Sequence, residues 1–166
     1  MLIKELKPRK ALNKAFLKVK PGRAEIERFK THLAQLLDRT NATESDEFHK
    51  NLVSDFLKNS HYRQNHFINT KGRNDLVIHN GPKPNSSVGV IIETKNPGNK
   101  TEMISGENIY KKAFHELLLY YLRERITHKN PEVKHLIITD TFQWYIFDAV
   151  LFDSLFAQNK SGTTVC

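Results

Sequence analysis

The sequence predicts an α/β protein in which a single mixed sheet is flanked by helices. Three observations lead to this prediction: apolar residues at helical spacing in the first third of the chain, short runs rich in Val and Ile in the middle, and a long apolar helix followed by two further strand-like runs. Alternation of helical and strand-like segments is typical of a sheet that is covered by helices.

Helices are expected in the N-terminal part of the chain. Residues 1–21 are rich in Lys and Arg with scattered apolar residues, so this segment is expected to be partly helical. Residues 24–37 gather apolar side chains on one helical face, and residues 43–58 do the same. Either Thr43 or Ser45 is a suitable N-cap for the second of these helices, because acidic residues follow in its first turn.

Three strands are expected next. Residues 62–69 form the first, and residues 73–78 and 88–95 are rich in Val, Ile and Leu. The turn chemistry of residues 79–82 and the prolines that follow predict that the last two strands form a hairpin with a somewhat long loop.

A long helix over about residues 107–127 is apolar nearly all round in its middle, which predicts burial on several sides. Two more strands are expected at residues 133–138 and 144–147. A helix between strands of one sheet implies a crossover connection, which is right-handed by the general rule.

Length and composition limit the class of protein. With 166 residues the chain is long enough for one domain with a core, and it contains no apolar run long enough to cross a membrane. The N-terminus lacks the apolar segment of a secretory signal. Because Cys166 is the single cysteine, disulfide scaffolds and cysteine-based zinc sites are excluded, and a reducing cytoplasmic setting is expected.

The net charge of +8 is unevenly distributed. Residues 1–30 hold ten Lys or Arg and three Glu, a net +7, while the remainder is close to neutral with sixteen basic and fifteen acidic residues. Such a basic arm suggests a polyanionic partner. A solvated arm, or one that docks on an acidic surface of another domain, is the equally weighted alternative.

The candidate chemistry lies in the predicted hairpin. Asp75 falls on one strand, and Glu93 and Lys95 fall two residues apart on the next, so the last two share a face. If the register brings Asp75 opposite Glu93, two carboxylates converge beside an ammonium group. Two carboxylates repel unless a cation joins them, and Mg²⁺ is the hard cation that such a pair holds. The bland alternative is a solvated ion pair on an exposed strand.

Asp75 followed by Glu93-Thr94-Lys95 resembles the PD-(D/E)XK nuclease signature, with Asn74 where a proline is usual. Residues 6–16, 47–52 and 112–124 are also similar to the N-terminal part of type IIG restriction–modification proteins, and this resemblance covers almost the whole chain. In those proteins an endonuclease domain precedes a DNA-adenine methyltransferase and a target-recognition region. The resemblance therefore implies a DNA endonuclease domain in a longer polypeptide.

The resemblance implies a restriction-endonuclease-like αβββαβ core with a central mixed sheet and an N-terminal helical extension. Residues 1–42 would be a basic arm and helix packed on the core, residues 43–150 the nuclease core, and residues 151–166 the start of a linker to further domains. S-adenosylmethionine would be used only by a methyltransferase domain elsewhere in the polypeptide, because no Gly-rich methyl-donor loop is present here.

The resemblance also implies roles for individual residues. Asp75 and Glu93 would hold Mg²⁺, with the Thr94 carbonyl as a third ligand, and Lys95 would assist the attacking water. An additional acid on the helix at residues 43–58 would lie near the metal, and Glu47 is the candidate; capping is its alternative role.

Further candidates rest on position and charge. Glu116 and Tyr120 stand where some related nucleases carry Gln-x-x-x-Tyr, although Glu116 paired with Lys112 one turn earlier is an equally good explanation. Positive charge makes four residues candidates for phosphate contacts: Lys71, Arg73, Lys111 and Lys112. The expected partner is double-stranded DNA, in a prokaryotic cytoplasm and away from membranes.

Two other classes of function stay open at the level of sequence. The first is a nuclease-like fold that only binds DNA or serves as a scaffold, which the complete set of Asp75, Glu93 and Lys95 disfavours. The second is an RNA nuclease or a repair nuclease of the same superfamily.

Overall fold

The computed structural model describes residues 4–72 and 75–158, and for Asp75 the backbone alone. The helices are α1 Pro8–Ala11, α2 Arg23–Arg39, α3 Asp46–Leu57, α4 Lys112–Leu122 and α5 Ala149–Phe152. The strands are β1 Ile68–Lys71, β2 Asp75–His79, β3 Val88–Thr94, β4 His135–Thr139 and β5 Trp144–Asp148. A short 3-10 turn (Phe16–Lys18) and three π-helical turns (Lys58–Tyr62, Arg123–Thr127, Asp153–Ala157) complete the described elements.

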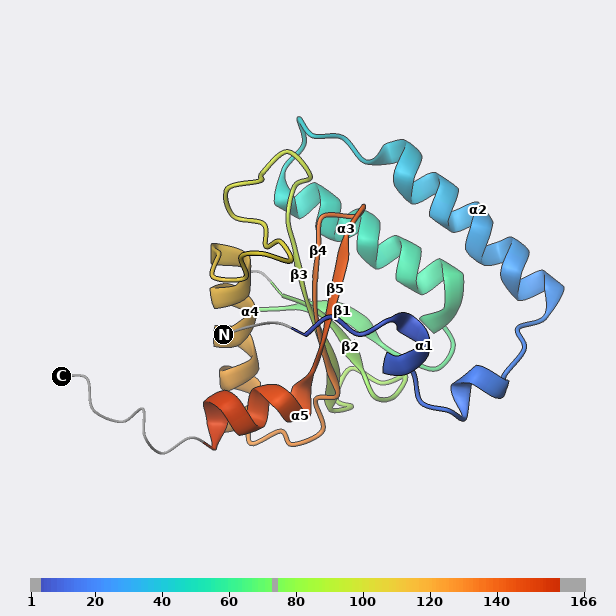
Figure 1. The fold of residues 1–166 in the computed structure, drawn as a ribbon. Coiled ribbons are helices and arrows are strands. Elements are labelled where there is room, and N and C mark those ends of the chain that lie inside the picture. The colour runs from blue at the N-terminus through green and yellow to red at the C-terminus, as the bar shows by residue number, and fades with distance from the viewer. Residues whose placement is uncertain (1–3, 73–74, 159–166) are drawn as a thin grey trace.

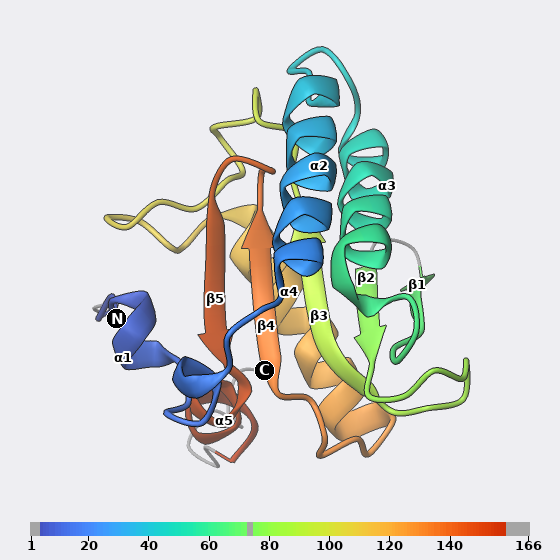
Figure 2. The ribbon, with the colours of Figure 1, turned by 90° about the vertical axis from the view of Figure 1, so that its right-hand side faces the viewer.

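The five strands form one mixed sheet in the order β1-β2-β3-β4-β5, which Figure 2 shows behind α2 and α3. Neighbouring strands are antiparallel except β3 and β4, which are parallel. The connection between β3 and β4 contains α4, as parallel neighbours require. The prediction of an α/β protein with a mixed sheet flanked by helices is therefore confirmed.

Helices cover both faces of the sheet. In Figure 1 the sheet lies between α4 on one side and α3 on the other, with α2 outside α3. Because side chains alternate along a strand, Ile91 packs into the core under α4 and α5, whereas Ile92 packs into the core under α2 and α3. Burial on both faces explains why β3 is apolar almost throughout.

The β2–β3 hairpin sets the register on which the candidate site depends. Leu76 pairs with Ile92 and Val77 with Ile91 in an antiparallel ladder. The paired positions of this ladder end at Leu76 and Ile92, and the next residues along the two strands are Asp75 on β2 and Glu93 on β3. Continuing the register by one residue would set these two positions opposite each other, as the sequence predicts.

The boundaries of two predicted elements need correction. Residues 58–62 continue α3 as a π-helical turn, so the first strand begins at Ile68 rather than at residue 62. The long helix begins at Lys112 rather than at residue 107, because buried Ile109 draws the preceding segment against the core. The backbone N–H of Ala113 donates to the carbonyl of Glu102 at 3.1 Å, which fixes this loop against the start of α4.

Ser45 is the N-cap of α3. Its hydroxyl oxygen accepts a hydrogen bond from the backbone N–H of Phe48 at 3.1 Å, and Asp46 and Glu47 lie in the first turn. This decides between the two predicted caps, Thr43 and Ser45, in favour of the second.

The C-terminal prediction also needs correction. Residues 149–157 are helical, and Phe152 is buried in the core beside Phe114, with ring centroids 5.6 Å apart. This stretch therefore belongs to the domain and is not the start of a linker. Residues 159–166 lie outside the described part of the chain.

The N-terminal arm, residues 4–22, is exposed throughout, whereas α2 packs on α3 through buried Leu36. Phe16 is 70% exposed and Leu12 is 52% exposed. Within residues 4–42, α2 packs on the core, and the described residues of the arm that precedes it are exposed. Among the described residues no helix is both long enough and apolar enough to span a membrane.

The turn between β4 and β5 contains an unusual backbone conformation. Thr141 has a φ of 74° and is 2% exposed. Its hydroxyl oxygen is buried without a hydrogen-bond partner among the described residues. A β-branched residue is strained in the left-handed region.

Candidate functional site

The candidate site lies where β3 ends. Glu93 and Lys95 are each only 3% exposed, although both carry charged groups. Charged side chains are rarely buried to this extent unless they are paired. The Nζ atom of Lys95 lies 2.9 Å from Oε1 of Glu93, so the two form a buried ion pair at the edge of the sheet.

Three more carboxylates surround the same ammonium group. Nζ of Lys95 lies 2.6 Å from Oε2 of Glu116, 3.4 Å from Oε2 of Glu102 and 3.7 Å from Oδ2 of Asp46. Glu116 is on α4, Glu102 is on the loop before α4, and Asp46 is at the start of α3. The lysine of one strand is therefore the meeting point of four elements of the fold.

A second lysine closes a ring of alternating charges. Nζ of Lys112 lies 2.9 Å from Oε1 of Glu102 and 3.9 Å from Oε1 of Glu116, and the other oxygen of each carboxylate faces Lys95. The ring Lys95–Glu102–Lys112–Glu116 thus uses both oxygens of both glutamates. We call these four residues together with Glu93 the lysine–carboxylate cluster.

Burial shifts the pKa of Glu93. Loss of hydration raises the pKa of Glu93 to about 8, the nearby Lys95 opposes the shift, and the neighbouring Glu116 adds to it. Burial alone would lower the pKa of Lys95, but Glu93 and Glu116 outweigh it, and the pKa of Lys95 is raised above its ordinary value. Lys95 is accordingly cationic at neutral pH, and Glu93 takes up a proton more readily than an exposed glutamate.

Lys112 and Glu102 stabilise each other at the rim of the cluster. The hydrogen bond from Lys112, together with the field of Lys95, lowers the pKa of Glu102. Glu102 and Glu116 in turn raise the pKa of Lys112. Both groups of this pair therefore stay ionised near neutral pH.

One oxygen of Glu93 is left without a partner. Oε1 pairs with Lys95, but Oε2 is buried and has no hydrogen-bond partner among the described residues. A buried carboxylate oxygen in this state is costly unless a donor or a cation reaches it. The free oxygen is therefore a place where a hard cation would be stabilising.

Asn96, the residue after Lys95, anchors the cluster to the segment before α3. Its backbone N–H donates to Oδ1 of Asp46 at 2.6 Å, and its side-chain amide donates to the backbone carbonyls of Ala42 and Glu44. Because Asp46 is also near Lys95, one short segment fixes the start of α3 against the end of β3.

The structure places the acid of α3 differently from the prediction. Glu47 is 62% exposed and pairs with Lys50 at 2.5 Å, whereas the neighbouring Asp46 approaches Lys95. Glu47 is thus not brought to the cluster. Asp46 and Glu102 were not among the predicted site residues. Two features of the sequence could have identified them. Asp46 directly precedes Glu47 on the predicted helix, and Glu102 lies in the loop that follows Glu93-Thr94-Lys95.

The other predicted site residues are distributed as follows. Glu116 is in the cluster, and Tyr120, one turn later on α4, is 6% exposed in the core with the guanidinium of Arg123 5.9 Å from its ring. Thr94 is buried, and its hydroxyl lacks a partner among the described residues. The backbone of Asp75 begins β2 and pairs with that of Lys71 on β1, and its side chain lies outside the described part of the structure.

The predicted phosphate contacts are less available than their charges suggest. Lys71 pairs with Glu124, and Lys112 belongs to the ring described above. Lys111 is the half-buried N-cap residue of α4, and Arg73 lies outside the described residues. Two of the four core cations expected to meet phosphates are therefore engaged in internal ion pairs.

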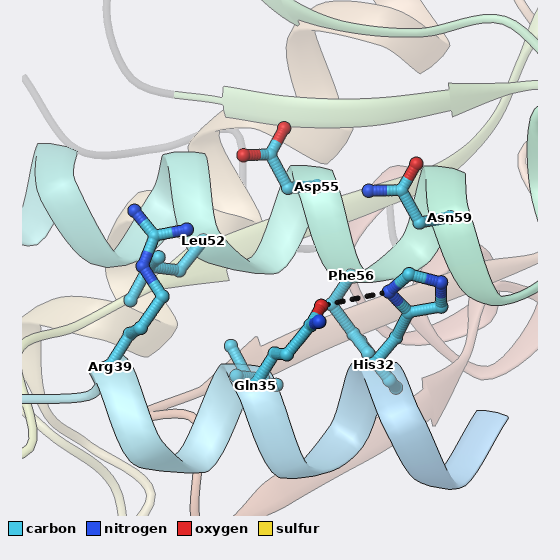
Figure 3. Close-up of a pocket in the computed structure, with 8 residues that line it drawn as sticks. His32, Gln35, Arg39, Leu52, Asp55, Phe56 and Asn59 are labelled. Atoms are coloured by element: carbon cyan, nitrogen blue, oxygen red, sulfur yellow. Dashed lines mark hydrogen bonds between the residues drawn. The ribbon is translucent and has the colours of Figure 1, made fainter. Parts of the chain in front are cut away.

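Two surface hollows lie away from the cluster. The smaller, of about 80 Å³, is formed between α2 and α3, where His32 and Gln35 are hydrogen-bonded at 3.1 Å (Figure 3). The larger, of about 510 Å³, lies at the other end of β3 and includes His79, whose ring nitrogens contact the carbonyl of Ser86 and the amide oxygen of Asn69. No residue of the cluster lines either hollow.

The cluster partly satisfies the needs of a divalent cation. Carboxylate and carbonyl oxygens are the ligands that Mg²⁺ prefers, and the unpartnered Oε2 of Glu93 offers one of them. Within residues 4–72 and 75–158, as far as their side chains are described, no group of three or more His, Cys, Asp or Glu is arranged to hold a metal ion.

The fold and the cluster define an α/β domain with a buried lysine–carboxylate cluster at one edge of a mixed sheet. A family model described as "Domain of unknown function (DUF7149)" matches residues 6–164, and the chain belongs to this family. No curated protein and no solved structure matches the chain.

Proposed function

We propose that this chain is a Mg²⁺-dependent DNA endonuclease domain that hydrolyses phosphodiester bonds, built on a restriction-endonuclease-like core. The single observation that carries the proposal is the buried pair of Glu93 and Lys95 at the end of β3, with one Glu93 oxygen unpartnered. The β2–β3 register supports it, because continuing the ladder one residue past Leu76 and Ile92 leads to Asp75 and Glu93. These three positions carry the residue types of the PD-(D/E)XK signature.

Each residue has a role that follows from its chemistry. Asp75 and Glu93 would hold Mg²⁺ together with the backbone carbonyl of Thr94, and the raised pKa of Glu93 reflects its burial, which a bound cation would counteract. Bound Mg²⁺ lowers the pKa of a coordinated water and neutralises charge on the phosphate. Lys95 orients the attacking water and stabilises negative charge on the phosphate oxygens.

The surroundings of Lys95 favour a catalytic role over simple neutralisation. The ammonium group of Lys95 lies within 4 Å of four carboxylates, whereas one carboxylate would be enough to balance its charge. It is therefore held more tightly than neutralisation of Glu93 requires. Glu116 from α4 makes the shortest of these contacts and acts as a further group that orients Lys95. A group used in catalysis benefits from such fixed orientation.

A DNA-binding or scaffolding module is the second candidate. The observation that favours it is the fully paired state of Lys95, because a buried ion-pair network also serves to join sheet, loop and helix. The resemblance to type IIG restriction–modification proteins further leads us to propose that methyltransferase and target-recognition domains accompany this domain in one polypeptide. Under that proposal, sequence specificity resides outside these residues.

The proposal is tested with Asp75→Asn and Glu93→Gln, which remove ligand charge and preserve shape. Both variants are expected to lose Mg²⁺-dependent plasmid cleavage by at least about a hundredfold, and to lose calorimetric Mg²⁺ binding. Glu132→Gln, on the exposed segment before β4, is the matched control. The proposal would be contradicted if Glu93→Gln cleaved as fast as wild type, or if wild type still cleaved after a chelator had removed the metal.

A further inference from the structure

Lys95 has more carboxylate neighbours than it has hydrogens to donate. An ammonium group carries three N–H donors, and four carboxylates, those of Glu116, Glu93, Glu102 and Asp46, lie at 2.6, 2.9, 3.4 and 3.7 Å from Nζ. Glu93 is on β3, which Lys95 directly follows, and Glu116 is on a packed helix. The third neighbour, Glu102, comes from a loop, so its position depends on how that loop is fixed.

The loop carrying Glu102 is firmly attached. Met103, Ile104 and Ile109 are buried in the core beneath α4. The backbone N–H of Glu102 donates to the side chain of Asn99 at 3.3 Å, and its carbonyl accepts from Ala113 at 3.1 Å. The backbone of Glu102 is thus fixed through both its N–H and its carbonyl, independently of the ion pairs that its carboxylate makes.

Lys112 fixes the carboxylate itself. Its Nζ lies 2.9 Å from Oε1 of Glu102, which turns Oε2 toward Lys95. We propose that Glu102 is a positioning residue which, held by Lys112, forms an ion pair with Lys95 and fixes the direction of its ammonium group. The consequence for catalysis rests on the proposed nuclease function, whereas the orientation of Lys95 does not.

The proposal distinguishes Glu102 from the other acids near Lys95. Asp46 is farther, at 3.7 Å, and is already bonded to the backbone of Asn96. Without Glu102, the flexible four-carbon stem of Lys95 retains only Glu93 and Glu116 as close partners. One of these, Glu93, is the residue that the proposed metal would also engage, so Glu102 keeps Lys95 in place when Glu93 turns to the metal.

The test observes the ammonium group of Lys95 directly in the metal-free 166-residue chain. Lysine side chains labelled with ¹⁵N give ¹H–¹⁵N signals when proton exchange with water is slow, and Lys95→Met assigns the Lys95 signal by its loss. We expect a slowly exchanging signal for wild type. In Glu102→Ala the exchange rate should rise at least about tenfold, because one of the ion pairs that hold the ammonium group is lost.

Three comparisons make the result specific. Glu102→Gln keeps an acceptor oxygen and should restore much of the protection. If Glu102→Ala fails to fold, Lys112→Met, which releases the Glu102 carboxylate, should raise the exchange rate in the same direction. Glu107→Ala, on an exposed part of the same loop, should behave as wild type. An exchange rate within about twofold of wild type in Glu102→Ala, or in Lys112→Met where Glu102→Ala does not fold, overturns the proposal.

Catalysis provides the second readout. If the chain cleaves DNA, Glu102→Ala should lower kcat by about ten- to a hundredfold and leave KM nearly unchanged, because an ill-positioned Lys95 affects the chemical step. An unchanged kcat overturns the catalytic part of the inference. If wild type does not cleave while Lys95 exchange still depends on Glu102, the nuclease function fails and the positioning of Lys95 by Glu102 stands.

Discussion

Lys95 and Glu116 join the sheet to helix α4 through a contact of 2.6 Å between Nζ and Oε2, although neither residue belongs to the two hydrophobic cores. The contact lies at the point where β3 ends and the crossover to β4 begins. An apolar core already packs α4 on the sheet, so a buried ion pair is not required to hold them together. Lys95 thus has more ion pairs than packing of α4 on the sheet requires, and for this reason we propose a functional role for Lys95.

Lys95→Met separates a catalytic lysine from a neutralising one. If Lys95 acts on the water or the phosphate, the variant should keep Mg²⁺ affinity and lose cleavage. Lys95→Arg should not rescue cleavage, because a planar guanidinium cannot replace a compact ammonium among four carboxylates. Calorimetry with Mg²⁺ and plasmid cleavage are measured on the same samples. Near-normal cleavage by Lys95→Met at saturating Mg²⁺ would remove Lys95 from the mechanism.

The raised pKa of Glu93 leads us to expect that the stability of the domain depends on pH. Its pKa in the folded protein is about 8, above the ordinary value of 4.5 that applies when the chain is unfolded, because burial favours the protonated form. The folded state therefore binds more protons in this interval, and the free energy of unfolding falls as pH rises from about 4.5 to 8. The contribution of Glu93 is fully present below pH 4.5 and is lost as pH passes through the folded pKa.

Thermal unfolding without metal measures this effect. The Tm of Glu93→Gln relative to wild type should increase between pH 5 and pH 8 by at least a few degrees, which corresponds to about 1 kcal/mol for a domain of this size. Saturating Mg²⁺ should raise the Tm of wild type and leave Glu93→Gln unchanged. A Tm difference that is constant with pH would argue against a protonated Glu93.

The arm predicts weak DNA binding that is sensitive to salt and independent of sequence. Its basic side chains are exposed, whereas Lys71, Lys95, Lys100 and Lys112 of the core are in ion pairs. Replacing Lys7, Lys10 and Lys14 with Ala should weaken binding, and it should reduce the slope of log K against log salt by up to about three. Fluorescence anisotropy with unrelated duplexes at several salt concentrations gives both quantities.

The matched control replaces with Ala three exposed lysines that lie outside the arm: Lys83, Lys129 and Lys134. This variant has the same net charge as the arm variant and should retain most of the binding. Equal losses in the two variants would show that overall charge, and not the arm, attracts DNA. Selective binding to one sequence by this chain would contradict the assignment of specificity to other domains.

Thr141→Gly is expected to stabilise the domain. The substitution relieves the left-handed conformation of a β-branched residue, which costs about 1–2 kcal/mol, and removes a hydroxyl that lacks a partner among the described residues. Loss of a buried methyl group and the flexibility of glycine offset part of this gain, so we expect about 1 kcal/mol. Urea denaturation measures the change, with Thr101→Gly on an exposed loop as the comparison. A destabilised Thr141→Gly would mean that packing of the threonine outweighs its strain.

Local sequence pattern was sufficient for the sheet and for part of the cluster. The apolar run of β3 predicts that Ile91 and Ile92 face two different cores, and the charges of Glu93 and Lys95 mark where that apolar run ends. The hairpin follows from turn residues between two strand-like runs. Each of these signals spans fewer than about ten residues, the range over which strand and turn preferences operate.

The remainder of the cluster could not be predicted because it depends on tertiary contacts. Glu102 reaches Lys95 only because Ile109 draws the loop against the core, and this same contact delays the start of α4 to Lys112. Asp46 reaches the cluster through Asn96, a contact between distant segments. Lys112 was expected to contact phosphate from its charge alone, and charge does not reveal that two glutamates already engage it.

The parallel pairing of β3 with β4 has a consequence for the order of folding. The β2–β3 hairpin brings together neighbouring segments, whereas β4 can join β3 only after residues 95–134 have closed their long connection. Loop-closure entropy makes such a non-local step slow. Because Glu102, Lys112 and Glu116 all lie on that connection, we expect the ion pairs around Lys95 to assemble among the last contacts to form. A chain arrested before that step would have a nearly complete hairpin and no organised cluster, so its chemistry would appear only once the domain has finished folding.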